Sequence, residues 1–107
     1  MTDKLVILST CASEAEAATL AGLLIDKRLA ACVNVLAPVR SFYRWQGKVE
    51  SGQEALLVIK SSRGRFAELR AAIEQAHSYD VPEIIALPIE DGAAPYLAWM
   101  QENLENA

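Results

Sequence analysis

The chain has 107 residues, which suffices for one domain with one hydrophobic core and is too short for a second. Hydrophobic residues make up 52% and charged residues 22%, the composition expected of a folded soluble protein. Asp and Glu outnumber Lys and Arg by 14 to 10, and the net charge of -4 disfavours nucleic acid as a partner, because phosphate binding depends on clustered positive charge. We therefore expect a single soluble domain over residues 1–107.

The amino-terminal sequence offers only a short apolar run, residues 5–8, before polar residues resume. This run is too short for the apolar part of a signal peptide and far too short to cross a bilayer. The two cysteines, Cys11 and Cys32, are too few for a disulfide framework and lack the spacing of a CxxC motif. We therefore expect reduced thiols in a cytoplasmic protein without membrane contacts.

The first two predicted elements are a strand and a helix. Residues 5–8 form an unbroken apolar run, typical of a central strand that is covered on both faces. Ser13 and Glu16 have the spacing of a capping box, and residues 15–28 then repeat apolar side chains at helical intervals. The spacing therefore predicts a helix that begins at this capping box.

The longest predicted feature is a β-hairpin over residues 31–60. Its first arm is rich in β-branched and aromatic residues, its second ends in an apolar run, and Gly47 permits the positive φ of a tight turn. At about 3.3 Å per residue, a straight first arm would extend roughly 50 Å. A compact domain of this size has a radius of gyration of only about 13 Å. The hairpin must therefore bend or project, and Pro38, which cannot donate a ladder hydrogen bond, marks the expected bend.

Three more elements follow the hairpin. We expect Ser61 and Ser62 to cap a second helix that ends near His77, a fourth strand over residues 83–87 and a last helix over residues 96–103. The resulting order is that of a ferredoxin-like βαββαβ sandwich, an α+β fold with its helices on one face of an antiparallel sheet. The other sheet face and the aromatic tip of the hairpin would be exposed, so we predict an oligomer built around the hairpin.

The sole histidine, His77, opens a short segment that is rich in groups able to bind metals. His77 and Glu83 could hold copper or zinc, and a thiolate from Cys11 or Cys32 could join them. In the structural alternative, His77 caps the end of a helix and Cys32 is a small buried hydrophobe. The sequence leaves both interpretations open.

A second candidate site surrounds the hairpin tip. Its residues either pack between subunits or line an inter-subunit cleft for a ligand, and the set comprises Tyr43, Arg44, Trp45, Lys48, Lys60 and Tyr79. No glycine-rich phosphate loop follows the first strand, and the HExxH, GxSxG and CxxC patterns do not occur. We therefore expect a binding protein and not an enzyme.

Four segments of the chain are similar to the CutA family of divalent-cation tolerance proteins: LAACVN at 29–34, SFYRWQGK at 41–48, YDVPEIIALPI at 79–89 and YLAW at 96–99. The resemblance implies a ferredoxin-like fold and a homotrimer whose long hairpins interlock the subunits, with a shape similar to that of PII-type signalling trimers. It also implies a role in metal-ion tolerance, with copper or other divalent cations bound by some members. Copper-binding members carry a cysteine and a histidine where this chain has Ser9 and Ala76, so of that ligand set only His77 matches.

The leading hypothesis is therefore a homotrimeric cytoplasmic protein with an extended hairpin and a C-terminal helix, which takes part in divalent-metal tolerance and response by binding copper, zinc or other divalent cations. The alternative is a PII-like signalling module that binds a small anionic ligand or a partner protein at inter-subunit clefts. A purely structural trimer that serves as an assembly platform is a third hypothesis.

Overall fold

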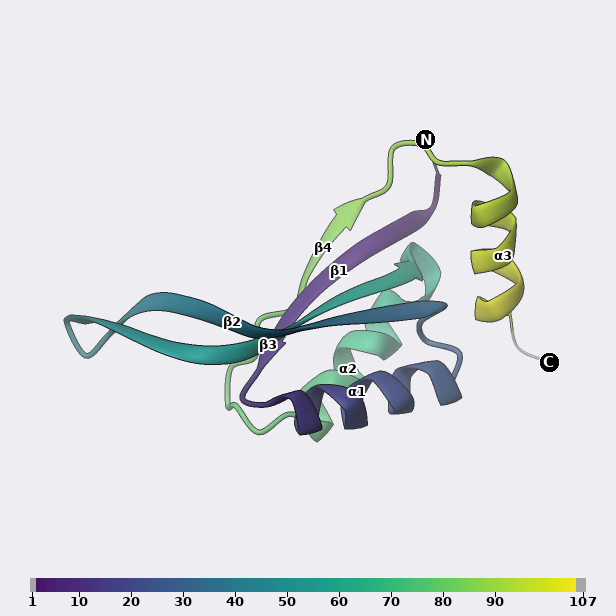
Figure 1. The fold of residues 1–107 in the computed structure, drawn as a ribbon. Coiled ribbons are helices and arrows are strands. Elements are labelled where there is room, and N and C mark those ends of the chain that lie inside the picture. The colour runs from purple at the N-terminus through teal and green to yellow at the C-terminus, as the bar shows by residue number, and fades with distance from the viewer. Residues whose placement is uncertain (1, 106–107) are drawn as a thin grey trace.

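A four-stranded antiparallel sheet forms the centre of the computed structural model, which describes residues 2–105 (Figure 1). The strand order β2-β3-β1-β4 is that of the predicted ferredoxin-like sandwich, so the predicted fold class is confirmed. The elements in chain order are β1 (Lys4–Cys11), α1 (Glu14–Asp26), β2 (Cys32–Trp45), β3 (Lys48–Ser62), a 3-10 turn (Arg63–Arg65), α2 (Phe66–Ala76), β4 (Ile85–Pro88) and α3 (Ala94–Leu104).

The main hydrophobic core lies between the sheet and the helices α1 and α2. Side chains alternate along a strand, and in β1 Leu5, Ile7 and Cys11 point into this core. The buried members contributed by the helices are apolar residues at helical spacing, namely Ala17, Leu20, Leu24, Leu69 and Ile73. The predicted helix faces are therefore the faces that pack on the sheet.

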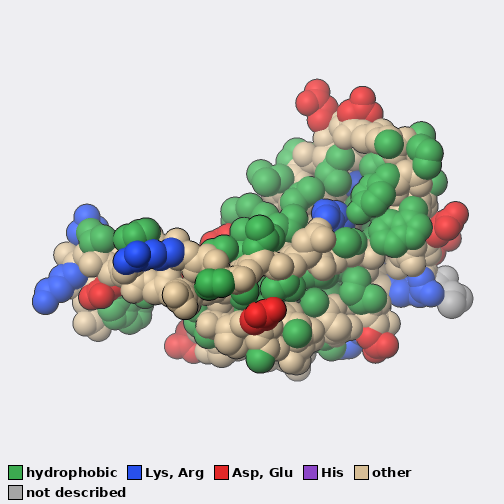
Figure 2. Space-filling view, viewed as in Figure 1, with side chains coloured by type: hydrophobic (Ala, Val, Ile, Leu, Met, Phe, Trp, Pro, Cys, Tyr) green, Lys and Arg blue, Asp and Glu red, His purple; other side chains and the backbone are tan. Residues whose placement is uncertain are grey.

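The opposite face of the sheet carries no helix over most of its area. Strand pairing places on it the apolar side chains Val6, Leu8, Leu36, Leu56, Val58, Ile85 and Leu87. Leu36, Ile85 and Leu87 are about half exposed, and Figure 2 shows hydrophobic side chains gathered over the region of β1, β4 and α3. The predicted exposure of this face is thus confirmed for the single chain, and we call it the open sheet face.

The hairpin of β2 and β3 projects beyond the sheet and makes the molecule 45 × 25 × 22 Å in extent (Figure 1). Its arms stay paired from Cys32 opposite Lys60 to Trp45 opposite Lys48. The register shifts between Leu36 and Val39, around the cis peptide of Pro38. Gln46 and Gly47 form the turn with φ of 50° and 81°, the left-handed pair that a tight hairpin requires. The predicted length, bend and turn of the hairpin are all confirmed.

The capping box predicted at the start of α1 forms only in part. The Ser13 hydroxyl accepts a hydrogen bond from the Glu16 amide at 3.1 Å, as expected of an N-cap. The Glu16 carboxylate, however, binds the hydroxyl and the amide of Ser78 across the fold. The helix also ends at Asp26, two residues earlier than predicted, because the chain turns at Arg28 with φ 55°.

The prediction that Ser61 and Ser62 cap the second helix is wrong. β3 runs through both serines, and the 3-10 turn then precedes α2, with no side-chain cap at either start. The Ser61 hydroxyl is buried and donates to the Leu29 carbonyl at 2.5 Å. The other end of α2 matches expectation, because the helix stops at Ala76 and His77 is its C-cap. β4 begins two residues later than predicted.

The helix α3 packs at the end of the sheet on a small second core of Ala31, Met100 and Leu104. Arg65 Nε donates to the Leu104 carbonyl at 2.9 Å, and Lys4 Nζ donates to the Gln101 side chain at 2.7 Å. The arginine therefore satisfies a carbonyl at the helix end that lacks an intrahelical partner. Among residues 2–105, no helix has the length and apolarity needed to cross a membrane.

Candidate functional site

The side chain of His77 is fully buried at the junction between α2 and the segment leading to β4. Its Nε2 lies 2.8 Å from the Thr10 carbonyl oxygen, and its Nδ1 lies 3.0 Å from the Tyr79 amide nitrogen. A carbonyl can only accept and an amide N–H can only donate, so this pattern assigns the proton to Nε2 and leaves Nδ1 as the acceptor. Neither ring nitrogen has a free lone pair for a metal ion in this arrangement.

Glu16, on α1, binds the same junction through hydrogen bonds. Its carboxylate accepts from the Ser78 hydroxyl at 2.8 Å and from the Ser78 amide at 3.0 Å, and it lies 3.6 Å from Nδ1 of His77. Burial raises the pKa of Glu16, but the two hydrogen bonds from Ser78, together with His77 and the Ala12 backbone, outweigh burial, so the pKa of Glu16 is lowered. The segment after α2 is therefore held to both α1 and β1.

Tyr79 and Cys11 are the other titratable groups of this junction. The Tyr79 hydroxyl donates to Glu54 at 2.7 Å, and burial together with this hydrogen bond raises the pKa of Tyr79, so the phenol stays protonated. Burial also raises the pKa of Cys11, and the nearby carboxylates of Glu16 and Glu54 add to the effect. Cys11 is therefore a neutral thiol facing the core, where it donates to the Ser13 carbonyl at 3.4 Å.

A groove of about 970 Å³ lies between the hairpin and the segment that follows α2. Its lining contains four aromatic rings and three carboxylates; the residues are Thr10, Ser41, Phe42, Tyr43, Trp45, Gly52, Gln53, Glu54, Tyr79, Asp80, Val81 and Glu83. No Lys or Arg belongs to this part of the described surface. We call this feature the aromatic–acidic groove.

The groove joins some of the predicted site residues and leaves others out. Tyr43, Trp45 and Tyr79, three residues predicted for an inter-subunit cleft, line it together with Glu83, a predicted metal ligand. Two predicted cleft residues at the hairpin turn, Arg44 and Lys48, are not part of the lining. Arg44 instead donates to the Gly47 carbonyl within the turn, at 3.3 Å.

Cys32 and Lys60 lie at the opposite end of the sheet. They face each other across β2 and β3, and Lys60 donates a hydrogen bond to the Asn34 side chain. Cys11 pairs with Ala55, and the five-position step from Ala55 to Lys60 corresponds to roughly 17 Å of strand. The two cysteines therefore belong to different regions, and within one chain Lys60 lies away from the aromatic–acidic groove.

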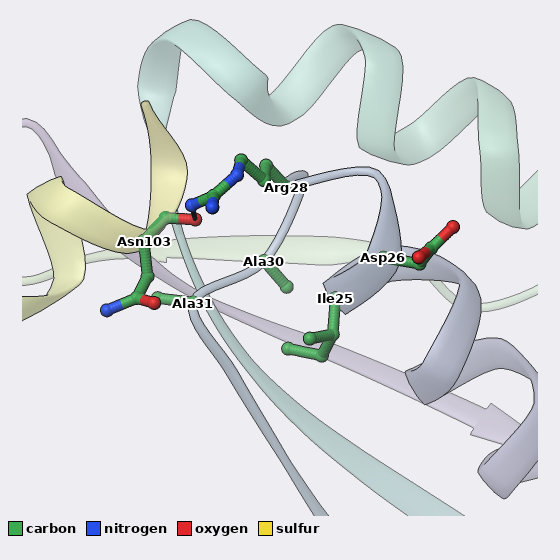
Figure 3. Close-up of a pocket in the computed structure, with 6 residues that line it drawn as sticks. All are labelled: Ile25, Asp26, Arg28, Ala30, Ala31 and Asn103. Carbon is green, nitrogen blue, oxygen red and sulfur yellow. Dashed lines mark hydrogen bonds between the residues drawn. The ribbon is translucent and has the colours of Figure 1, made fainter. Parts of the chain in front are cut away.

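A smaller pocket of about 260 Å³ lies where α1, the start of β2 and α3 meet (Figure 3). Arg28 extends from the turn after α1 toward Asn103, and its Nη1 lies 3.4 Å from the Asn103 carbonyl oxygen. The remaining lining residues are Ile25, Asp26, Ala30 and Ala31. The Arg28 side chain thus closes on the carbonyl end of α3, which indicates a structural role for this pocket.

The predicted metal ligands do not form a closed site within one chain. Within residues 2–105, no three His, Cys, Asp or Glu side chains converge in a way that could hold a metal ion. His77 and Cys11 are buried in the junction, Glu83 lines the groove and Cys32 is distant. Of the four predicted ligands, Glu83 alone belongs to the groove lining.

The sequence prediction did not include two polar groups of the site, Glu16 and Glu54, whereas Asp80 belongs to the predicted segment that begins at His77. A signal for Glu54 was present, because side-chain alternation along β3 from the buried Leu57 places Glu54 on the open sheet face, where Thr10 of the neighbouring β1 also lies. The contact between Glu16 and Ser78 joins residues that are 62 positions apart, and no local pattern announces it.

The fold and the groove define a class of small α+β proteins in which a ferredoxin-like sandwich carries a long projecting hairpin with a binding groove at its side. The family model described as CutA1 divalent ion tolerance protein matches residues 5–103, and the chain belongs to this family.

Individual relatives agree with the assignment. The divalent-cation tolerance protein CutA of Thermus thermophilus is 47% identical over 98 residues, which cover 92% of this chain and 95% of that protein. The human Protein CutA is 40% identical over 97 residues, and the match covers 91% of this chain but only 54% of that longer protein. A solved structure, described as the periplasmic divalent cation tolerance protein CutA of Archaeoglobus fulgidus, has a TM-score of 0.92 and 40% identity, covering 95% of this chain and 99% of that one.

Proposed function

We propose that the chain serves in divalent-metal tolerance and response as a homotrimeric cytoplasmic protein that binds divalent cations, copper or zinc among them, and catalyses no reaction. The observation that carries this proposal is membership of the CutA1 family over residues 5–103. The Thermus thermophilus relative, with 47% identity, is named for divalent-cation tolerance. Assembly, cation binding and location each need a separate test.

Trimer assembly is supported by the open sheet face and by the hairpin. The face carries a continuous set of apolar side chains, and an exposed apolar surface of this kind is typical of a subunit contact. The substitution Leu87→Asp, on the open sheet face, should therefore lower the mass measured by light scattering toward the 11.7 kDa of one chain. Ile25→Asp is the matched control, because Ile25 is similarly exposed (43% against 49%) on the helix side. A wild-type mass of one chain would contradict trimer assembly.

Cation binding is supported by the carboxylates of the aromatic–acidic groove. Carboxylate oxygens bind divalent cations, and Glu83 and Asp80 line the groove together with Glu54. His77 would have to release the Tyr79 amide before it could act as a ligand. We therefore place the first contact with the cation at Glu83.

Calorimetric titration with Cu²⁺ and with Zn²⁺ tests this placement. Glu83→Gln should weaken binding, because the substitution removes one negative charge and keeps the shape of the side chain. Glu74→Gln is the control, since Glu74 lies on the exposed side of α2, 3.7 Å from Arg70 and outside the groove. A wild-type protein that shows no saturable uptake of either ion would contradict the proposed function.

The cytoplasmic location rests on the free cysteines. Cys11 and Cys32 are both unpaired, and the roughly 17 Å of strand between their positions prevents a disulfide within the chain. Small exported domains commonly use disulfides, whereas cytoplasmic proteins keep their thiols reduced. Cell fractionation with a tagged chain checks the location.

The alternative of a PII-like module with a small anionic ligand has less support. No Lys or Arg lines the aromatic–acidic groove, and Lys60 is bound to Asn34 at the other end of the sheet. An anion would therefore meet three carboxylates in the groove without a compensating positive charge.

A further inference from the structure

The short segment between β4 and α3 carries a dipeptide that is chemically reactive in proteins. Asp91 is followed by Gly92, and no other Asp or Asn of the chain is followed by glycine. A peptide nitrogen can attack the side-chain carboxyl group of the preceding aspartate, and glycine shields its nitrogen least because it has no Cβ atom. The segment runs beside the amino terminus and away from the hairpin (Figure 1). It therefore lies outside the hairpin and the open sheet face, the surfaces proposed for trimer contacts.

The structure places the two reacting groups of this dipeptide next to each other. The Gly92 amide donates a hydrogen bond to Oδ1 of Asp91, with a nitrogen–oxygen distance of 2.8 Å. Oδ1 is bonded to Cγ, the carbon that the amide nitrogen would attack, so a rotation of the side chain brings the nitrogen and the carbon together. Both residues are exposed, which gives access to the water that the reaction consumes.

The Asp91 carboxylate has no second partner that would hold it away from this amide. Within residues 2–105, the Gly92 amide is the one hydrogen-bond donor that contacts the carboxylate, and no ion pair includes it. Asp91 does not cap α3 either, because Ala93 is the N-cap and no side-chain hydrogen bond forms there. The carboxyl group is therefore available for reaction.

We propose that Asp91 converts slowly, and without an enzyme, to isoaspartate. In the first step, the Gly92 nitrogen bonds to Cγ of the protonated carboxyl group, and the hydroxyl group leaves Cγ together with the amide proton as water. In the second step, water adds to the main-chain carbonyl carbon of Asp91 and breaks the bond from this carbon to the Gly92 nitrogen. The water that was lost is regained, so the mass is unchanged, and the main chain now runs through Cβ and Cγ of residue 91.

The added main-chain atom affects α3 through Leu97. A Cβ atom built at Gly92 would lie 3.3 Å from Cδ2 of Leu97, so the two residues already pack tightly. Leu97 packs in turn against the second core of Ala31, Met100 and Leu104. A longer main chain shifts Gly92 relative to Leu97, and closely packed side chains transmit such a shift. Isoaspartate at position 91 therefore loosens the packing of α3.

Incubation of the whole protein for several weeks at neutral pH and physiological temperature tests the chemistry. Peptide mapping should then show isoaspartate at position 91, because Asp-N protease cleaves before aspartate and not before isoaspartate. Asp26 and Asp80, which precede Lys27 and Val81, are internal controls and should remain aspartate. Asp91→Asn should react faster, since ammonia leaves an amide more readily than water leaves a carboxyl group. Asp91→Glu should form no such product, because its longer side chain would require a larger ring.

Limited chymotrypsin digestion tests the effect on α3. In Asp91→Asn, the aged sample should be cleaved after Trp99 about fivefold faster than the fresh sample, because such cleavage follows the population of the opened helix. Aged and fresh Asp91→Glu should be cleaved at equal rates. Absence of isoaspartate at position 91, or equal amounts at Asp26 and Asp80, would overturn the proposed site. Isoaspartate that leaves cleavage after Trp99 unchanged would overturn the proposed effect on α3.

Discussion

Replacing His77 tests whether this histidine fastens the junction or serves as a metal ligand. In His77→Ala, two partly buried backbone groups lose their partners, the Thr10 carbonyl and the Tyr79 amide. A buried polar group left unpaired costs about 1–3 kcal/mol, and partial burial places these two groups at the lower end, so the alanine variant should lose about 2 kcal/mol of unfolding free energy. His77→Asn places an oxygen near the position of Nδ1 and can keep the Tyr79 bond, so it should lose about half as much.

The measurement is urea unfolding of the wild type and both variants at one fixed protein concentration, because assembly makes apparent stability depend on concentration. Cu²⁺ and Zn²⁺ titrations of the same samples give the second readout, and we expect metal affinity to stay unchanged. An alanine variant within about 0.5 kcal/mol of the wild type would refute the reasoning, since this is the range of changes at positions without specific contacts. A loss of metal affinity in a fully stable variant would assign His77 to the metal instead.

Three further predictions follow from single positions. Ser9 Oγ is buried without a hydrogen-bond partner among the described residues, whereas Ser61 Oγ donates to Leu29 on the same side of the sheet. In urea unfolding, Ser9→Ala should therefore raise stability by about 1 kcal/mol and Ser61→Ala should lower it by at least as much; the same sign for both would contradict this. The pKa of Glu16 is lower in the folded than in the unfolded protein. The ionised Glu16 carboxylate therefore stabilises the folded protein fully above its unfolded pKa of roughly 4.3, and this contribution is lost as the pH falls through the lower folded pKa. In Glu16→Gln, the unfolding free energy should fall less steeply at acid pH than in the wild type. An unchanged dependence of the unfolding free energy on pH would count against the role of Ser78. Gly47→Ala should cost about 1–2 kcal/mol because φ is 81° there, a result that thermal unfolding can check.

The fold was predictable wherever a local pattern determined it. Residues 31–60 contain alternating and continuous apolar runs about a glycine turn, and these specified the hairpin, including the irregularity at Pro38. The serine pair at 61–62 misled because serine suits both a helix cap and a buried strand end. The hydrogen bond from Ser61 to Leu29, which spans 32 positions, decided between the two, and no local pattern could reveal it.

The candidate site was predictable in part. The aromatic residues Tyr43, Trp45 and Tyr79 line one groove of the single chain, whereas the cleft expected for them lies between subunits and stays a prediction. The charge of its lining was not foreseen. Lys60 lies at the other end of the sheet, and Lys48, although it pairs with Trp45 in the hairpin, is not part of the lining, whereas Glu54 reaches the groove through pairing between strands. Sequence distance is therefore a poor guide to the composition of a groove formed by three separate segments.

The second, smaller core under α3 has a consequence for how the molecule opens. Met100 and Leu104 bury themselves against Ala31 and share no contact cluster with the sheet core beneath α1 and α2. Detachment of α3 would require the release of Arg65, Lys4 and Arg28 but no disruption of the β1–β3 pairing. Proteins open locally in such cooperative units at lower free energy than global unfolding requires. We therefore expect α3 to open at a lower free energy than the sheet, and its opening would uncover Ala31, just before β2.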